Sequence, residues 1–129
     1  MVRAVLEGVA FSLRDVFALV SETAPDPLRE LRISGGGSNS PLWRQIIADV
    51  LGVPLSLTRT TEGVATGGAI LAAVGAGWYA SVPEASAAMV EVTSTTEPGP
   101  HAGAYDGAYA VYRSLYPALK DAFADLAEV

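Results

Sequence analysis

The sequence predicts an α/β fold built on a short parallel β-α-β unit with flanking helices. Leu31–Ser34 and Pro54–Thr58 are short apolar segments typical of strands, and the segment Pro41–Gly52 between them has the apolar spacing of a helix. Two strands joined through a helix pair in parallel with a right-handed crossover. The 129 residues suffice for one domain, and the 50% that are hydrophobic indicate a globular chain rather than a disordered one.

A long helix is predicted before the first strand. Apolar residues recur at steps of three and four from Val2 to Glu22, which places them on one helical face. This stripe consists of Val2, Val5, Leu6, Val9, Leu13, Val16, Phe17 and Val20. Pro25 and Pro27 end the first helix, while Pro41 suits the first turn of the second, where a missing amide hydrogen removes no bond.

The second half of the chain is predicted to add two shorter helices, an extended segment and a long closing helix. Glu62–Gly77 has the composition of a helix, but its many glycines suggest close packing against a neighbouring element or a ligand. Ser81 and Glu84 match a capping box that opens a short helix, and Val90–Thr95 is expected to be extended. The closing helix must kink or restart at Pro117. Its apolar stripe consists of Tyr105, Tyr109, Tyr112, Tyr116, Leu119 and Phe123.

Composition and charge exclude several classes of partner and location. The net charge of −6 argues against nucleic acid or an anionic membrane as the main partner. The absence of cysteine rules out disulfides and thiolate metal sites and fits a cytoplasmic protein. We expect no signal peptide. Val64–Ala80 is too short and too mildly apolar to cross a bilayer, so we expect it to be buried structure.

The most informative feature is a triglycine bend, Gly35, Gly36 and Gly37, between the first strand and the second helix. Glycines let the backbone turn sharply and let a ligand approach the main chain with no Cβ in the way. The helix that follows directs its free amides and positive dipole end toward whatever sits over the bend. Polar side chains that suit a ribose or a purine edge flank this cleft: Ser38, Asn39 and Ser40.

The residues alone leave the role of the bend open. No Gly-Lys-Ser/Thr follows it, so it is not the phosphate loop of P-loop proteins. The third glycine of the dinucleotide fingerprint is missing, and no acidic residue ends the next strand. A plain strand-to-helix connection is therefore an equal alternative to a binding site.

No catalytic or metal-ligating residue is predicted in this chain. His101, the single histidine, lies in a link rich in proline and glycine and is expected to be solvated. Asp49 is expected to serve packing or capping, and Glu62 opens a helix whose dipole favours an acid there. The tyrosine stripe of the closing helix is predicted to be core rather than part of a cofactor site.

A sheet of two or three strands is thin for a chain of this length. The predicted helices carry more apolar face than such a sheet can cover. We therefore expect the chain to be part of something larger.

Four segments in order resemble the carboxyl-terminal end of the FGGY family of sugar kinases, and most closely the xylulokinases within it. They are Arg3–Phe11, Gly35–Asp49, Glu62–Gly77 and Tyr105–Lys120, and together they extend over nearly the whole chain. The resemblance implies a partial actin-like, ribonuclease H-like ATPase domain. It also implies ATP-dependent phosphorylation of D-xylulose to D-xylulose 5-phosphate, with Mg²⁺, by a much longer protein.

By this resemblance the chain supplies the adenosine side of the ATP site. The nucleotide would contact the backbone of the triglycine bend, and the side-chain positions beside it are Asn39 and Ser40. Many relatives have asparagine at the position of Ser40, whereas this sequence has it one residue earlier. The sugar site, the catalytic aspartate and the strands that hold the β- and γ-phosphates would lie outside this chain. We therefore expect no kinase activity from the chain alone, and weak affinity for ATP or ADP.

Three alternatives remain at this level. Gluconate, ribulose and glycerol kinases of the same family share this frame, so the sugar cannot be assigned from these residues. A non-enzymatic module would associate with a second copy through an apolar face and a strand edge, and a homo-oligomer is expected on the same grounds. An unrelated α/β nucleotide binder would need phosphate-holding residues in this chain, and the sequence shows none.

Overall fold

The computed structural model describes residues 1–60 and 62–128. Its elements are, in order, α1 (Val2–Thr23), β1 (Leu31–Ile33), the 3-10 turn η1 (Gly36–Asn39), α2 (Pro41–Leu51), β2 (Leu55–Thr58), α3 (Gly63–Gly75), α4 (Val82–Met89), β3 (Val92–Thr96) and α5 (Ala104–Ala127). The predicted β-α-β unit is confirmed, because β1 and β2 are parallel and α2 connects them.

The sheet has three strands in the order β1-β2-β3. Leu31 of β1 lies opposite Leu55 of β2, and β3 pairs antiparallel on the other side of β2. The hydroxyls of Ser56 and Thr95 hydrogen-bond across the antiparallel pair at 3.0 Å. The extended segment predicted near residue 92 is thus the third strand, and β1 is an edge strand.

Local sequence sets both ends of α2. The Ser40 side chain accepts a hydrogen bond from the backbone N–H of Trp43 at 3.3 Å, and Pro41 occupies the first turn. At the other end Gly52 has φ +69°, a left-handed conformation that glycine adopts without a Cβ clash. The side chains that α2 buries are Ile46, Ile47, Ala48 and Val50.

The core consists of two apolar clusters that share α2. One joins α1, α2 and α5 through Ala10, Phe11, Ile46, Val50 and Tyr105. The other joins α2 to the sheet through Ile47, Ala48 and Leu55. Trp43 packs against both clusters, so α2 connects the outer helices to the sheet.

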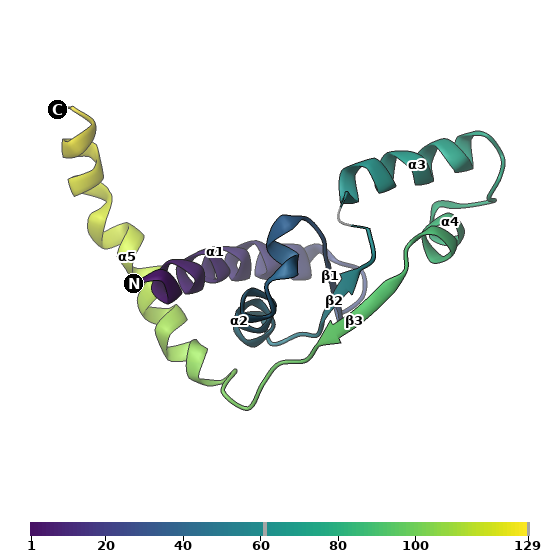
Figure 1. Ribbon diagram of the computed structural model, residues 1–129. Coiled ribbons are helices and arrows are strands. Elements are labelled where there is room, and N and C mark those ends of the chain that lie inside the picture. Colours follow the sequence, from purple (N-terminus) through teal and green to yellow (C-terminus); the bar gives the residue numbers. More distant parts are fainter. Residues whose placement is uncertain (61, 129) are drawn as a thin grey trace.

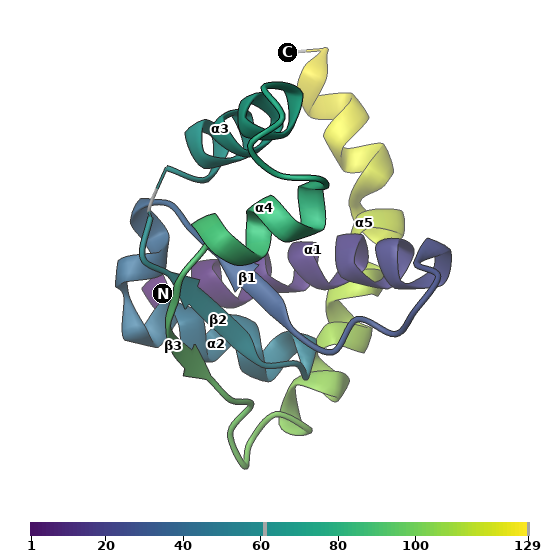
Figure 2. The same cartoon turned by 90° about the vertical axis from the view of Figure 1, so that its right-hand side faces the viewer.

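The helices are distributed unevenly around the sheet. Helices α1 and α2 lie on one side of it, and α3 and α4 project from the other side (Figures 1 and 2). Helix α5 crosses α1 and runs away from the rest of the chain to the C-terminus (Figure 1). None of the helices in residues 1–60 and 62–128 combines the length and apolar character needed to cross a membrane.

Helix α1 forms where predicted, and most of its apolar stripe is exposed, which agrees with the expectation that the helices carry more apolar face than the sheet can cover. Its fully buried residues are Ala10 and Phe11, while Leu6 and Phe17 are half-buried. The other members of the stripe are exposed: Val2, Val5, Val9, Leu13, Val16 and Val20. The sheet ends at β1, so among the described residues too little packs against this side of α1 to cover it.

The prediction that Val64–Ala80 is buried is wrong for most of its length, although Ile70 and Ala73 are buried. Val64 is 95% exposed and Trp78 is 79% exposed, because α3 packs mainly against the short helix α4. The close packing expected of the glycines is seen only at Gly63, where an added Cβ would lie 2.6 Å from Ser34 Oγ. The other glycines of this segment have open space at the Cβ position: Gly67, Gly68, Gly75 and Gly77.

Helix α4 begins with half of the predicted capping box. The Ser81 hydroxyl accepts a hydrogen bond from the backbone N–H of Glu84 at 3.3 Å. The Glu84 carboxylate accepts from the N–H of Ala80 at 2.9 Å, one residue before the expected partner. The predicted capping residues, Ser81 and Glu84, are therefore confirmed, and one of the two bonds is displaced by one position.

The tyrosine stripe of α5 is core along its first half only. Phe11 packs on three tyrosine rings, those of Tyr105, Tyr109 and Tyr112, at centroid distances of 6.1, 5.8 and 5.4 Å. Burial raises the pKa of the Tyr105 phenol, whose O–H donates to the Glu7 carboxylate at 3.1 Å.

Beyond Arg113 the helix extends past α1 and its apolar side chains are exposed, with Tyr116 at 66% and Phe123 at 51%. Helix α5 continues without interruption through Pro117, so it does not restart there.

Candidate functional site

The triglycine bend has a backbone shape that requires glycine at its first position. Gly35 has φ +92° and ψ 172°, a combination that residues with a Cβ rarely adopt. The chain then makes the 3-10 turn η1, in which Ser38 N–H donates to the Gly35 carbonyl at 3.0 Å. The Ser38 hydroxyl donates to the same carbonyl at 2.6 Å. These bonds close the bend at the carboxyl end of β1.

The bend is open to solvent, not sealed in the core. Gly36, Gly37, Asn39 and Ser40 are exposed, and an added Cβ on Gly36 would meet no atom within 4 Å. Among the described residues, no acceptor bonds the backbone N–H of Gly36 or Gly37. Two peptide donors are therefore free for a ligand.

Helix α2 contributes fewer free donors than its sequence suggests. Pro41 has no amide hydrogen, and the N–H of Trp43 is used by the Ser40 hydroxyl. Of the first three positions of α2, only Leu42 keeps an N–H without an acceptor among the described residues. The positive end of the α2 dipole still faces the bend, so the glycine amides and the dipole act together.

One of the flanking polar residues has a different role from the predicted one. Ser38 is only 1% exposed, and its hydroxyl bonds the backbone of the bend instead of lining the cleft. Asn39 and Ser40 are on the surface, although Ser40 already caps α2. Asn39 is thus the flanking side chain with the most freedom to reach a ligand.

A cavity of about 170 Å³ lies next to the bend, at the carboxyl ends of β1 and β2. Hydroxyl-bearing residues from β2, from α3 and from the segments just after β1 and β2 line it, together with two glycines of α3. They include Ser34, Thr58, Thr60, Gly63, Thr66 and Gly67. Residues 36–40 do not line this cavity, so the bend itself is an exposed surface segment beside it.

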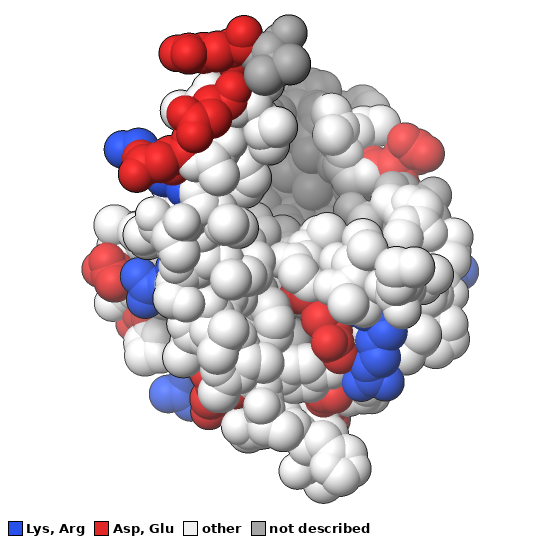
Figure 3. Space-filling view, turned by 90° about the vertical axis from the view of Figure 1, so that its left-hand side faces the viewer, with Lys and Arg blue, Asp and Glu red and all other residues white. Residues whose placement is uncertain are grey.

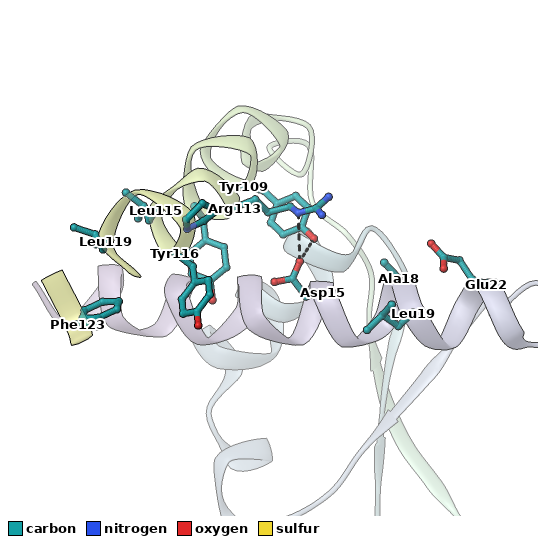
Figure 4. A pocket seen from close by; sticks show the side chains of 12 residues that line it. Asp15, Ala18, Leu19, Glu22, Tyr109, Arg113, Leu115, Tyr116, Leu119 and Phe123 are labelled. Atoms are coloured by element: carbon teal, nitrogen blue, oxygen red, sulfur yellow. Dashed lines mark hydrogen bonds and ion pairs between the residues drawn. The ribbon is translucent and has the colours of Figure 1, made fainter. Parts of the chain in front are cut away.

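A larger cavity of about 790 Å³ lies far from the bend in sequence, between α1 and α5 (Figure 4). Apolar side chains form its sides, among them Leu19, Tyr116 and Phe123. At its base Asp15 accepts from the Tyr109 hydroxyl and lies 3.8 Å from Arg113. These features suit packing against another apolar surface more than nucleotide chemistry.

The structure also shows where the other candidate residues from the sequence lie. The Asp49 carboxylate accepts from Gly99 N–H at 2.6 Å and from the Gln45 amide at 2.8 Å, which confirms a packing role. His101 is exposed, as predicted, and Glu62 stands at the N-cap of α3 without a side-chain capping bond. Within residues 1–60 and 62–128, no group of three or more histidine or acidic side chains is arranged to hold a metal ion.

Comparison with known proteins decides the family. Residues 1–76 match the C-terminal domain of the FGGY family of carbohydrate kinases. The chain belongs to the FGGY family. A xylulose kinase of Staphylococcus epidermidis is 33% identical over 125 residues, which are 96% of this chain and 25% of that protein.

Solved FGGY kinases show the same fold. A xylulose kinase from Rhodospirillum rubrum is 34% identical with a TM-score of 0.77 over 94% of this chain and 25% of that one. The ligand-bound xylulose kinase from Lactobacillus acidophilus reaches 0.85 at 22% identity, over 96% of this chain and 25% of that one. The predicted actin-like α/β domain is therefore confirmed. Ribulose, glycerol and gluconate kinases are also among the matches, and the chain spans 25% of the length of the Staphylococcus epidermidis xylulose kinase, 20% of that of a ribulokinase and 16% of that of a glycerol kinase.

The backbone of Gly35 gives the first prediction. Gly35→Ala should lower the free energy of unfolding by about 1–3 kcal/mol, because φ +92° is strained for alanine although the space for a methyl group is open. Gly36→Ala is the matched control, since its Cβ also meets open space and its φ lies outside that strained range. Its effect should stay within about 0.5 kcal/mol. Urea unfolding followed by circular dichroism measures both, and equal losses would contradict the strain assigned to Gly35.

Proposed function

We propose that this chain is the nucleotide-binding, C-terminal part of an ATP-dependent sugar kinase and contributes the adenosine side of the ATP site. The observation that supports it is the pair of solvent-facing N–H groups on Gly36 and Gly37 at the carboxyl end of a parallel strand. In open α/β sheets ligands bind beyond the carboxyl ends of the strands. Gly35, Gly36 and Gly37 would approach the nucleotide through their backbone, with Asn39 and Ser40 at its side.

Mg²⁺ is expected in the complete kinase, where it would neutralise charge on the nucleotide phosphates. We assign no residue of this chain to it. The sugar hydroxyl would be oriented and deprotonated by residues on polypeptide outside this chain, and a cytoplasmic location stays a prediction.

D-Xylulose is the proposed sugar. The match to the Staphylococcus epidermidis xylulose kinase extends over 96% of the chain, whereas a match to a Synechocystis glycerol kinase extends over 60%. The ribulokinase of Mycolicibacterium smegmatis matches 88% of the chain at 40% identity, so another five-carbon ketose is the nearest alternative. The reaction proposed for the complete protein is the transfer of a phosphoryl group from ATP to D-xylulose, giving D-xylulose 5-phosphate.

The chain alone should be inactive. Mixed with ATP, Mg²⁺ and D-xylulose, it is expected to release no ADP above background, because positioning and charge stabilisation of the transferred group need residues outside it. A coupled assay of ADP release measures this, with the full-length Rhodospirillum rubrum xylulose kinase as positive control. Clear turnover by the chain would refute the assignment of the reacting machinery elsewhere.

The chain should nevertheless bind ADP weakly at the bend. Titration followed by amide chemical shifts should move the signals of Gly36 and Gly37, and Gly36→Val should reduce the affinity by tenfold or more by covering the amide edge. The Cβ position of Gly36 is open, so this change should leave the fold intact. Gly68→Val, on the exposed surface of α3, is the control. ADP binding that survives Gly36→Val unchanged would show that the nucleotide binds elsewhere.

A second candidate function is self-association as a non-catalytic module. Large apolar side chains are exposed along α1 and the end of α5, and within the described part of the chain β1 has a strand neighbour on one side only. Figure 3 shows the face at the α5 end of the molecule, which is mostly uncharged, with acidic groups gathered near the C-terminus, where the sequence has Asp121, Asp125 and Glu128. Exposed apolar surface and open strand edges favour association.

Light scattering tests this candidate on the purified chain. We expect a mass of at least twice the 13.3 kDa of one copy, and a shift toward one copy in Leu19→Glu with Tyr116→Glu, which place charges on the cavity between α1 and α5. A compact monomer of the unchanged chain across the micromolar range would count against it.

A further inference from the structure

The fourth residue of α2, Arg44, reaches back to the triglycine bend. A terminal guanidinium nitrogen of Arg44, Nη1, donates a hydrogen bond to the Ser38 carbonyl, six residues earlier. Arg44 is half-buried, and its Nε is buried without a partner among the described residues. The guanidinium is therefore held against the inner side of the bend instead of extending into solvent.

Trp43 supports the same segment from beside it. A Cβ built on Gly37 would lie 3.4 Å from both Cδ1 and Nε1 of the indole, so the ring edge lies directly beside the bend. The indole also packs against both apolar clusters of the core. The indole therefore connects the position of Gly37 to the packed core.

Ser38 determines the direction of the free donor. The Gly35 carbonyl accepts from both the N–H and the hydroxyl of Ser38, at 3.0 and 2.6 Å. This carbonyl and the N–H of Gly36 belong to one peptide unit, which is planar and trans, so the two groups point in opposite directions. Fixing the carbonyl inward therefore directs the Gly36 N–H outward.

We propose that Ser38, Trp43 and Arg44 are positioning residues that aim the backbone N–H groups of Gly36 and Gly37 at the nucleotide. The inference rests on the proposed function, and it adds that the site depends on side chains that the ligand does not touch. Ser38 fixes the Gly35 carbonyl, Arg44 fixes the Ser38 carbonyl, and Trp43 supports Gly37. Without them the bend keeps its glycines but loses the common orientation of its donors.

The test measures ADP affinity by the amide shifts of Gly36 and Gly37 in the unchanged chain and in three variants. Ser38→Ala removes a hydroxyl without altering charge, and Arg44→Met removes the donor to Ser38. Each should weaken ADP binding by about fivefold, the effect of losing one hydrogen bond. Arg44→Lys keeps the charge but not the planar fork of donors, so its affinity should lie between those of the unchanged chain and Arg44→Met.

Arg29→Met is the matched control. Arg29 is exposed, and no hydrogen bond or ion pair joins it to another residue in 1–60 or 62–128. Arg29→Met should keep full ADP affinity. This control separates the effect of removing one positive charge from the effect of releasing the Ser38 carbonyl. Circular dichroism and the dispersion of the amide spectrum identify the variants that are folded. If Ser38→Ala and Arg44→Met do not fold, the ADP affinity of the conservative variant Arg44→Lys still tests the proposal.

The outcomes are distinguishable. Weaker binding in the folded Ser38 and Arg44 variants, with Arg29→Met unchanged, supports the positioning role. Affinity equal to that of the unchanged chain in every folded variant, Arg44→Lys included, overturns it while leaving the nucleotide site in place. If the unchanged chain itself shows no ADP-dependent shift at Gly36 and Gly37, the proposed nucleotide site fails, and the positioning role fails with it.

Discussion

The burial of α2 is the constraint on which the rest of this structure depends. Its apolar residues face two directions, with Ile46 and Val50 against α1 and α5 and Ile47 and Ala48 against β2. A fully buried side chain of this size contributes about 1.5–3 kcal/mol relative to its exposed state. Few other contacts join the outer helices to the sheet, so displacing α2 would separate them.

The same helix gives the triglycine bend its shape. Ser40 caps it just after the glycines, Trp43 lies beside Gly37, and Arg44, its fourth residue, bonds the Ser38 carbonyl. The Gly35 carbonyl accepts from Ser38 within the bend and the Ser38 carbonyl accepts from Arg44 of α2, whereas the amides of Gly36 and Gly37 are left for solvent or a ligand. A segment with almost no side chains of its own thus becomes a directional set of donors because a packed helix orients it.

The exposed apolar surfaces agree with the fact that the relatives are much longer than this chain. The chain spans about a quarter of the xylulose kinase it matches, and it leaves the stripe of α1, most of α3 and the second half of α5 exposed. In a longer kinase those faces have other polypeptide available to cover them. The polar, exposed strand β3 contrasts with β1, whose neighbourhood includes an apolar groove lined by Leu13, Phe17 and Leu31. Of the two sheet edges, β1 is therefore the one suited to further burial.

Local rules in the sequence determined where the elements lie. Apolar periodicity predicted α1 and α2, proline and glycine predicted their ends, and the strand–glycine–helix order predicted the β-α-β unit and the exposed bend, all of which depend on neighbours in the chain. Tertiary structure alone decided which faces are buried, because an apolar stripe such as Val5 and Val9 is packed only where another element reaches it. It also decided that Ser38 is buried and Arg44 half-buried beside the bend, because the burial of these side chains depends on how α2 packs, although the bonds they make are local in sequence.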